Sequence, residues 1–105
     1  MEMTPPRAMP VFNTNVAAVF SEIGDLLELE NANPFRERAY RNAARMLEEL
    51  DRNVQEMVAQ NEDLDALPGI GPDLAVEIVE VLTTGTCGQL QRLRQEVVPT
   101  LLDLL

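Results

Sequence analysis

The segment "LPGIGPDLA", residues 67–75, places one glycine on either side of Ile70, and apolar residues at helical spacing follow it. Glycine permits positive φ and close approach of another backbone, and a helix N-terminus presents unpaired amides and a positive dipole end. We therefore predict a tight hairpin between two closely packed short helices. Its residues Pro68, Gly69, Ile70 and Gly71 are suited to bind one phosphate of a nucleic acid backbone without reading its sequence. A plain turn without a ligand is the alternative.

Apolar residues recur at helical spacing along most of the chain, and no segment alternates apolar and polar residues as a half-buried strand does. The predicted helices begin near Asn15, at Pro34 behind the N-cap Asn33, at Asn53, after Gly71 and after the cap residue Thr86. Gly85 is expected to end the fourth helix, and Pro99 to open a separate last turn. The predicted fold class is all-α, a compact bundle of about five short helices that contains one helix-hairpin-helix motif.

The second predicted helix has an apolar stripe that is expected to face the core. The residues of this stripe are Phe35, Ala39, Ala43, Met46, Leu47 and Leu50. Asn33 and Pro34 suit the start of this helix, as N-cap and first helical residue.

The same helix concentrates positive charge. Its arginines lie within one short segment that contains one acid, Glu37, and they are Arg36, Arg38, Arg41 and Arg45. The last three follow helical spacing on one stripe, and Arg36 lies one turn before Tyr40. Guanidinium groups suit phosphate oxygens, and tyrosine can donate a hydrogen bond or stack on a base. A solvated face with Arg45 paired to Glu48 or Glu49 explains the pattern equally well.

The chain as a whole is acidic, with a formal net charge of −10, and its eight basic residues are all arginines. Acidity repels DNA, since phosphate contacts dominate that affinity, so binding depends on the local cluster of arginines. One cysteine and no histidine exclude an internal disulfide, an ordinary zinc site and a histidine-based nucleophilic pair. The sequence has neither a signal-peptide layout nor the roughly 20 apolar residues of a membrane span. We expect a cytoplasmic protein with no membrane partner.

Residues 1–12 contain three prolines and are predicted to form a flexible N-terminal arm. Residues 13–105 are predicted to form one folded domain, since a chain of this length supports a single core. The last six residues include four leucines. Such an apolar end is expected to pack onto something, so we expect the chain to be a fragment of a longer protein.

The arginine-rich helix and the hairpin, in this order, resemble the N-terminal 8-kDa domain of family X DNA polymerases, with the closest likeness to bacterial and archaeal members. The resemblance rests on "VFSEIGDLLELENANPFRERAYRNAARMLEEL" and "LPGIGPDLAVEIVEVLTTG", and it covers nearly the whole chain from Asn15 onward. It implies a prokaryotic, nucleoid-associated domain that binds gapped or nicked double-stranded DNA without sequence specificity. The domain would hold the 5′-phosphate side of short gaps during gap filling in base excision repair.

The resemblance also implies roles for individual residues. By their positions in the motif, Arg36, Tyr40 and Arg41 would line a pocket for the 5′-phosphate, and Arg38 and Arg45 would extend the basic face. The hairpin amides of Gly69 and Gly71 would contact the DNA backbone. Backbone carbonyls of Asp65, Leu67 and Ile70 would hold a monovalent cation. No other cofactor is implied for this domain, and Mg²⁺ would be bound by the polymerase domain downstream in the same chain.

Family members with 5′-deoxyribose phosphate lyase activity use a lysine on the second hairpin helix as the Schiff-base nucleophile. Lysine is absent here, and Asp73 and Glu77 stand at the corresponding positions. A carboxylate cannot form a Schiff base, so we expect no catalytic residue in this chain, and the parent protein is expected to be a DNA-directed DNA polymerase. The same acids would weaken DNA binding by repulsion. The alternative function is an acidic helical protein-protein interaction module without DNA binding of its own.

Overall fold

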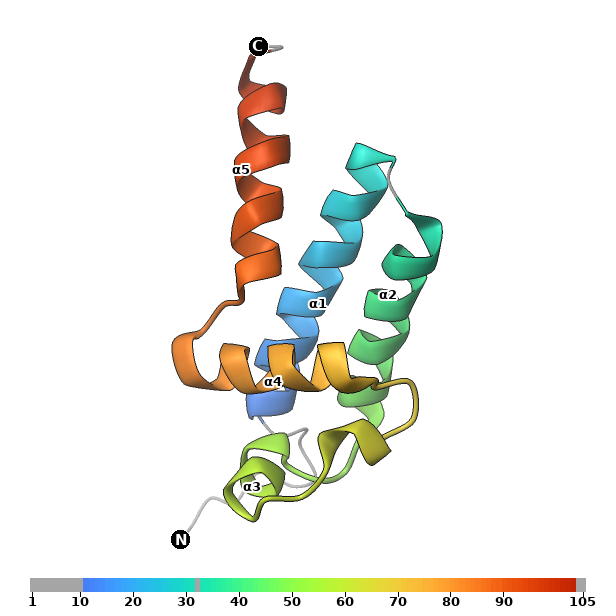
Figure 1. The fold of residues 1–105 in the computed structure, drawn as a ribbon, viewed down its shortest axis with the longest axis vertical. Coiled ribbons are helices and arrows are strands. Elements are labelled where there is room, and N and C mark those ends of the chain that lie inside the picture. Colours follow the sequence, from blue (N-terminus) through green and yellow to red (C-terminus); the bar gives the residue numbers. More distant parts are fainter. Residues whose placement is uncertain (1–10, 32, 104–105) are drawn as a thin grey trace, which may run out of the picture.

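The computed structural model describes residues 11–31 and 33–103, and it consists of helices joined by short turns (Figure 1). Its elements are α1 (Val11–Glu30), α2 (Pro34–Glu49), α3 (Val54–Ala59), the 3₁₀ turn η1 (Leu64–Ala66), α4 (Pro72–Thr84) and α5 (Gly88–Asp103). No strand occurs in these two ranges. The predicted all-α fold with one hairpin between helical segments is therefore confirmed. None of the described helices is both long and apolar enough to cross a membrane.

Helices α1 and α2 run antiparallel, and α4 crosses in front of their lower halves (Figure 1). α3 and η1 close this lower end, and α5 runs alongside α1. A two-pronged ion pair fixes α5 to α1, because Arg94 Nε and Nη2 each donate to a Glu22 carboxylate oxygen at 2.8 Å. The hairpin between η1 and α4 is thus held at the edge of a packed helical core.

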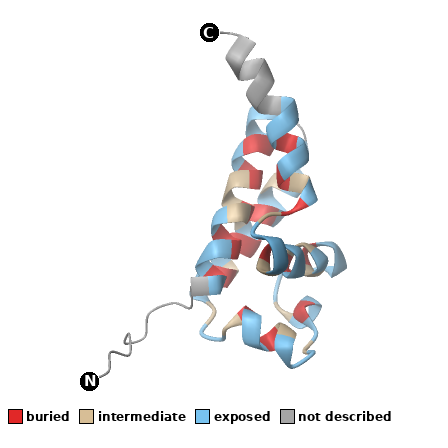
Figure 2. Cartoon of the chain, turned by 90° about the vertical axis from the view of Figure 1, so that its left-hand side faces the viewer, coloured by how far each residue is buried: buried red, intermediate tan, exposed pale blue. Residues whose placement is uncertain are grey.

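The core is built around α1, which packs against α2, α3, α4 and α5, and each of these helices contributes buried residues (Figure 2). The largest fully buried side chains include Phe20 and Tyr40, whose rings meet edge to face with centroids 5.3 Å apart. One buried polar residue ties the start of α1 to the connection between α2 and α3: Asn13 donates to the Arg52 carbonyl at 2.7 Å and accepts from the Val54 amide at 2.9 Å. The side chain of Asn13 thereby satisfies backbone groups that would otherwise be buried without partners.

Three of the predicted helix caps are confirmed. Asn33 accepts from the amides of Phe35 and Arg36, Asn53 accepts from Gln55, and Gly85 ends α4 at a φ of 86°. The predicted cap at Thr86 is wrong, since its hydroxyl is buried without a hydrogen-bond partner among the described residues. The amide of Gly88 instead donates to the Glu80 carboxylate at 3.1 Å. The start of α5 is therefore capped by a carboxylate of α4 and not by the hydroxyl of Thr86.

Three further sequence predictions need correction. α1 begins at Val11, so residues 11 and 12 belong to a helix, whereas residues 1–10 of the predicted arm lie outside the described residues. α5 continues through Pro99 to Asp103, with no separate last turn. The apolar stripe of α2 is wrong at Phe35, which is 75% exposed, and at Ala39, which is exposed. Its other predicted members are confirmed, since Ala43 and Leu47 are buried and Met46 and Leu50 pack partly buried against the core, which also contains Tyr40 and Ala44. The reason is that α1 and α4 cover α2 on the side of Tyr40.

Candidate nucleic-acid interface

The hairpin between η1 and α4 is closed by backbone hydrogen bonds. The amide of Leu67 donates to the Leu64 carbonyl at 3.0 Å, and the amide of Ile70 donates to the Leu67 carbonyl at 3.1 Å. Ile70 is buried, whereas Gly69 and Gly71 on either side of it are exposed. The isoleucine therefore anchors the turn in the core while the two glycines face outward.

The two glycine amides have no hydrogen-bond partner within the described part of the chain. Gly69 has a φ of 80°, a conformation that other residues rarely adopt, so the turn itself requires glycine there. Gly71 is different: its φ is −89°, and a Cβ placed on it would meet nothing within 4 Å. Neither its own conformation nor internal packing requires glycine at position 71. The absence of a side chain there leaves room for a molecule that approaches the start of α4.

Beside the hairpin, three side chains link α2 to α4. The Tyr40 hydroxyl donates to Glu77 Oε1 at 2.7 Å and accepts from Arg36 Nη2 at 3.0 Å. The structure thus brings the predicted pocket residues Arg36 and Tyr40 together. It also brings in Glu77 of α4. Tyr40 is 1% exposed, so its ring packs in the core and is not available to stack on a base.

This linked group has an altered ionisation. Burial raises the pKa of the Glu77 carboxyl above its usual value, although the hydrogen bond from Tyr40 and the charge of Arg36 act in the opposite direction. Burial, followed by the neighbouring Glu77, raises the pKa of the Tyr40 hydroxyl well above its usual range. Tyr40 therefore stays protonated at neutral pH and acts as the donor to Glu77.

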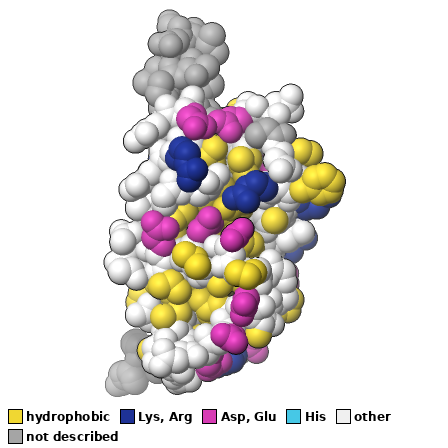
Figure 3. All heavy atoms as spheres, in the orientation of Figure 1, with side chains coloured by type: hydrophobic (Ala, Val, Ile, Leu, Met, Phe, Trp, Pro, Cys, Tyr) yellow, Lys and Arg dark blue, Asp and Glu magenta, His cyan; other side chains and the backbone are white. Residues whose placement is uncertain are grey.

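A hollow of about 340 Å³ opens next to these residues. Arg36 of α2 and Arg92 of α5 contribute positive charge to its wall, and three acids of α4 contribute negative charge: Asp73, Glu77 and Glu80. On the face that carries α4, Figure 3 shows arginines surrounded by acidic side chains. The described residues form no group of three or more acidic, cysteine or histidine side chains that could hold a metal ion. The two guanidinium groups of the hollow attract an anion, and the neighbouring carboxylates weaken this attraction.

Arg41 lies on another side of α2. Its guanidinium donates to Asp25 at 3.0 Å, to Glu28 at 2.8 Å and to Glu37 at 3.1 Å. The hydrogen bonds to Glu37 and Asp25 raise the pKa of Arg41. A Cβ on Gly24 would lie 3.0 Å from Cγ of Arg41, so the missing side chain in α1 makes space for it. The structure therefore places Arg41 in an ion-pair network between α1 and α2, and does not join it to Arg36 and Tyr40.

The remaining arginines of α2 are exposed. Neither Arg38 nor Arg45 forms an ion pair within the described residues, so the predicted pairing of Arg45 with Glu48 or Glu49 is not present. The Arg38 guanidinium lies 5.9 Å from the ring centre of Phe35, which is largely exposed at the start of α2. The sequence prediction missed Phe35 and Arg92 as surface groups. An exposed aromatic beside an arginine is typical of single-stranded nucleic acid contacts, but its exposure is not readable from helical periodicity.

Comparison with known proteins gives two findings. Residues 12–87 match the family model of the helix-hairpin-helix domain. The chain is also 34% identical, over 91 residues and 87% of its length, to the DNA polymerase/3′-5′ exonuclease PolX of Bacillus subtilis (strain 168). The chain spans 15% of the length of that relative. The likeness therefore concerns a small part of a much longer protein.

Proposed function

We propose that this chain, which belongs to the helix-hairpin-helix domain family, binds DNA through the sugar-phosphate backbone and without base specificity. The observation that carries the proposal is the pair of exposed, unpartnered amides at Gly69 and Gly71, at the N-terminus of α4. Amides in this position favour a phosphate through both hydrogen bonds and the helix dipole. They contact groups that every base pair shares, which is why no sequence preference is expected.

The exposed side of α2 would supply positive charge and a stacking surface. Arg38 and Arg45 are exposed and free of ion pairs within the described chain, and Arg36 lines the hollow beside α4. Phe35 offers a ring to an unpaired base. Tyr40 supports this surface by holding Arg36 through its hydroxyl and does not itself stack.

The relative's name and the earlier resemblance favour a finer role. We place this domain in a family X polymerase that fills short gaps in cytoplasmic DNA repair, with the 5′-phosphate of gapped or nicked DNA beside Arg36 and Arg92. Asp73 and Glu77 weaken this contact, because they place negative charge in the same hollow. The isolated domain would therefore bind weakly, and a downstream polymerase domain would supply most of the affinity.

The backbone contact is tested by substituting two glycines that share one conformation. Gly69 and Gly85 have φ of 80° and 86°, so alanine at either position should cost a similar ~1–2 kcal/mol of folding free energy. Only Gly69→Ala should also weaken binding to a DNA duplex, by about tenfold, because it distorts the amides that contact phosphate. Fluorescence anisotropy at low salt, below both unfolding temperatures, measures this difference. Equal affinities of the two variants would contradict the hairpin contact.

The 5′-phosphate contact needs a separate test. Gapped DNA with a 5′-phosphate and the same DNA with a 5′-hydroxyl are titrated with the chain and with Arg36→Ala. We expect a preference for the phosphate that Arg36→Ala removes. If both DNAs bind equally, the phosphate pocket is wrong while backbone binding stands. If neither binds at low salt, the alternative of an acidic protein-interaction module replaces both.

Lyase chemistry is not proposed for this chain. Glu77 accepts a hydrogen bond from Tyr40 in the place of a nucleophilic lysine, and the sequence contains no lysine elsewhere. Borohydride treatment with abasic-site DNA should therefore leave no covalent adduct, because a carboxylate forms no Schiff base. A strong adduct would contradict this expectation. The polymerase activity of a longer parent protein would require a separate domain.

A monovalent cation at the hairpin completes the proposal. Its ligands would be the backbone carbonyls of Asp65, Leu67 and Ile70. The Leu67 carbonyl already accepts from Ile70, which leaves one of its two lone pairs for a cation. Carbonyl oxygens suit such hard ions, and the ion would add positive charge beside the phosphate site.

A further inference from the structure

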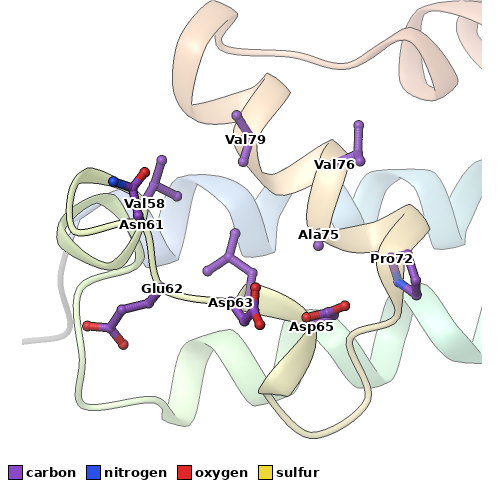
Figure 4. A pocket seen from close by; sticks show the side chains of 10 residues that line it. Val58, Asn61, Glu62, Asp63, Asp65, Pro72, Ala75, Val76 and Val79 are labelled. Atoms are coloured by element: carbon purple, nitrogen blue, oxygen red, sulfur yellow. The ribbon is translucent and has the colours of Figure 1, made fainter.

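A second surface that borders α4 is apolar. A hollow of about 420 Å³ lies between α4 and the segment formed by α3 and η1 (Figure 4). Its apolar wall is formed by Val58, Leu64, Pro72, Ala75, Val76 and Val79. Val76 is 67% exposed and Val79 is 39% exposed, although both belong to the middle of a helix. Contiguous exposed apolar side chains of this kind mark interaction surfaces.

The later turns of α4 border another apolar hollow. A second hollow, of about 370 Å³, is lined by Val81 and Leu82 of α4 together with Phe12 and Val19 of α1. Phe12 is 40% exposed. The wall residues contributed by α4 thus extend from its first turn to its last turn, over 13 residues or about 20 Å. This length matches a helix of three to four turns, about the common size of a helical recognition segment.

The rim of the first hollow is acidic. Glu62, Asp63 and Asp65 line it, and Figure 4 shows their carboxylates along the side opposite α4. Glu62 pairs with Arg52, whereas Asp63 and Asp65 form no ion pair in the described chain. These charges repel DNA and anionic membranes. They favour a partner that carries basic residues beside its apolar contacts.

We propose that this groove, defined by the two hollows along α4, binds an amphipathic helix of a partner protein, with leucine-like residues on the apolar wall and arginine or lysine over Asp63 and Asp65. The groove does not include the hairpin glycines, and it adjoins the proposed phosphate hollow at Val76, which lines both. Pro72 and Asp65 border both surfaces. A partner bound in the groove would therefore lie next to DNA held at the hairpin.

The test uses two fluorescein-labelled synthetic helical peptides of about 18 residues, long enough to cover α4. Both carry the same leucine stripe, and one has arginines where the other has glutamates. The full chain should bind the arginine peptide, and Val76→Ser should weaken that binding by about tenfold, since the side chain is buried only in the complex. Leu29→Ser is the matched control, because Leu29 is 59% exposed on α1 and lines neither hollow. Leu29→Ser should leave the affinity for the arginine peptide unchanged.

Charge is tested with the double variant Asp63→Asn and Asp65→Asn. This double variant should lower the affinity for the arginine peptide at low salt. It should have little effect on that affinity at high salt, where exposed charges are screened. Equal binding of the two peptides, or binding that Val76→Ser leaves unchanged, would overturn the proposal. So would self-association of the chain that Val76→Ser abolishes, which would assign the groove to a second copy. A gain in peptide affinity after deletion of residues 1–10 would assign it to the chain's own N-terminus.

Discussion

At the scale of single residues, Glu77 decides the charge beside the proposed phosphate site. It is half-buried, it accepts from Tyr40 at 2.7 Å, and it shares a hollow with Arg36. Its carboxylate therefore competes with any phosphate for the attraction of that guanidinium. A neutral residue of the same shape should convert this mixed site into a better anion site.

Glu77→Gln should strengthen binding to gapped DNA that carries a 5′-phosphate. The amide oxygen of glutamine can still accept from Tyr40, so the link between α2 and α4 is kept while the negative charge is lost. Removing one partly solvated repulsion of ~1 kcal/mol corresponds to about fivefold in affinity. Anisotropy titration measures the gain, and Glu49→Gln, at the exposed end of α2, is the control. An equal gain with the control would mean that total charge, not this site, is responsible.

Glu77 should also make stability depend on pH. Its pKa is raised by burial above the usual value of 4.5, so the folded chain binds this proton more tightly than the unfolded chain. The stabilising contribution of the protonated carboxyl is complete below that usual value and is lost as pH rises through the raised pKa. Thermal unfolding of the wild type and Glu77→Gln should therefore diverge, in favour of the variant, as pH rises from acid to neutral. A difference that stays constant with pH would contradict the shift.

At the scale of elements, one arginine adds an ion-pair network to the buried contacts between the antiparallel helices α1 and α2. Arg41 joins Asp25 and Glu28 of α1 to α2, and Gly24 leaves the space that its side chain occupies. Family likeness predicted this residue at the phosphate pocket, and that role stays a prediction. The geometry favours a structural role, because the guanidinium already donates to three neighbouring acids, whose negative charges repel a phosphate.

Arg41→Ala and Arg38→Ala should separate stability from binding. Loss of Arg41 should lower the unfolding free energy by about 1 kcal/mol, the scale of a partly exposed ion-pair network, and change DNA affinity little. Loss of Arg38, which forms no ion pair in the described chain, should weaken DNA binding and leave stability unchanged. Denaturant unfolding and anisotropy on the same samples measure both. If Arg41→Ala lowers DNA affinity more than Arg38→Ala does, Arg41 contacts phosphate and the structural role is wrong.

At the scale of the whole molecule, a few positive groups must overcome a net charge of −10. The hollow that contains Arg36 and Arg92 and the acidic, apolar groove both border α4, and Val76 lies between them because it lines both. One helix thus borders both a surface suited to an anion and a surface suited to a cationic partner. This arrangement would allow an acidic chain to bind DNA over a small area, as proposed above.

The small area has a measurable consequence. With about three phosphate contacts, the logarithm of the DNA affinity should fall with the logarithm of salt concentration at a slope near −3, far shallower than for proteins with large DNA interfaces. Removal of one contacting arginine, as in Arg45→Ala, should reduce the slope by about one. Titrations at several salt concentrations determine both slopes. A slope near zero would contradict backbone binding.

Local sequence determined the helical elements and the hairpin. Asn33, Asn53 and Gly85 mark helix ends because caps depend on residues within a few positions. The turn at Gly69 is also a local property, because its positive φ requires glycine. The family was also readable, since its motif lies in two continuous segments that the comparison covers.

Tertiary structure alone decided which face of each helix is covered and which charges meet. Tyr40 and Glu77 are 37 residues apart and bond only because α4 crosses α2. Arg41 contacts α1 because α1 packs along its side of α2. Phe35 is exposed because no helix covers its side of α2 among the described residues. Helical spacing determines which residues share a face, but it contains no information on which neighbour covers that face. The sequence by itself therefore determined the helices and their hairpin, and only packing decided that Glu77 lies beside Tyr40 and Arg36 and that Arg41 bridges α1 and α2.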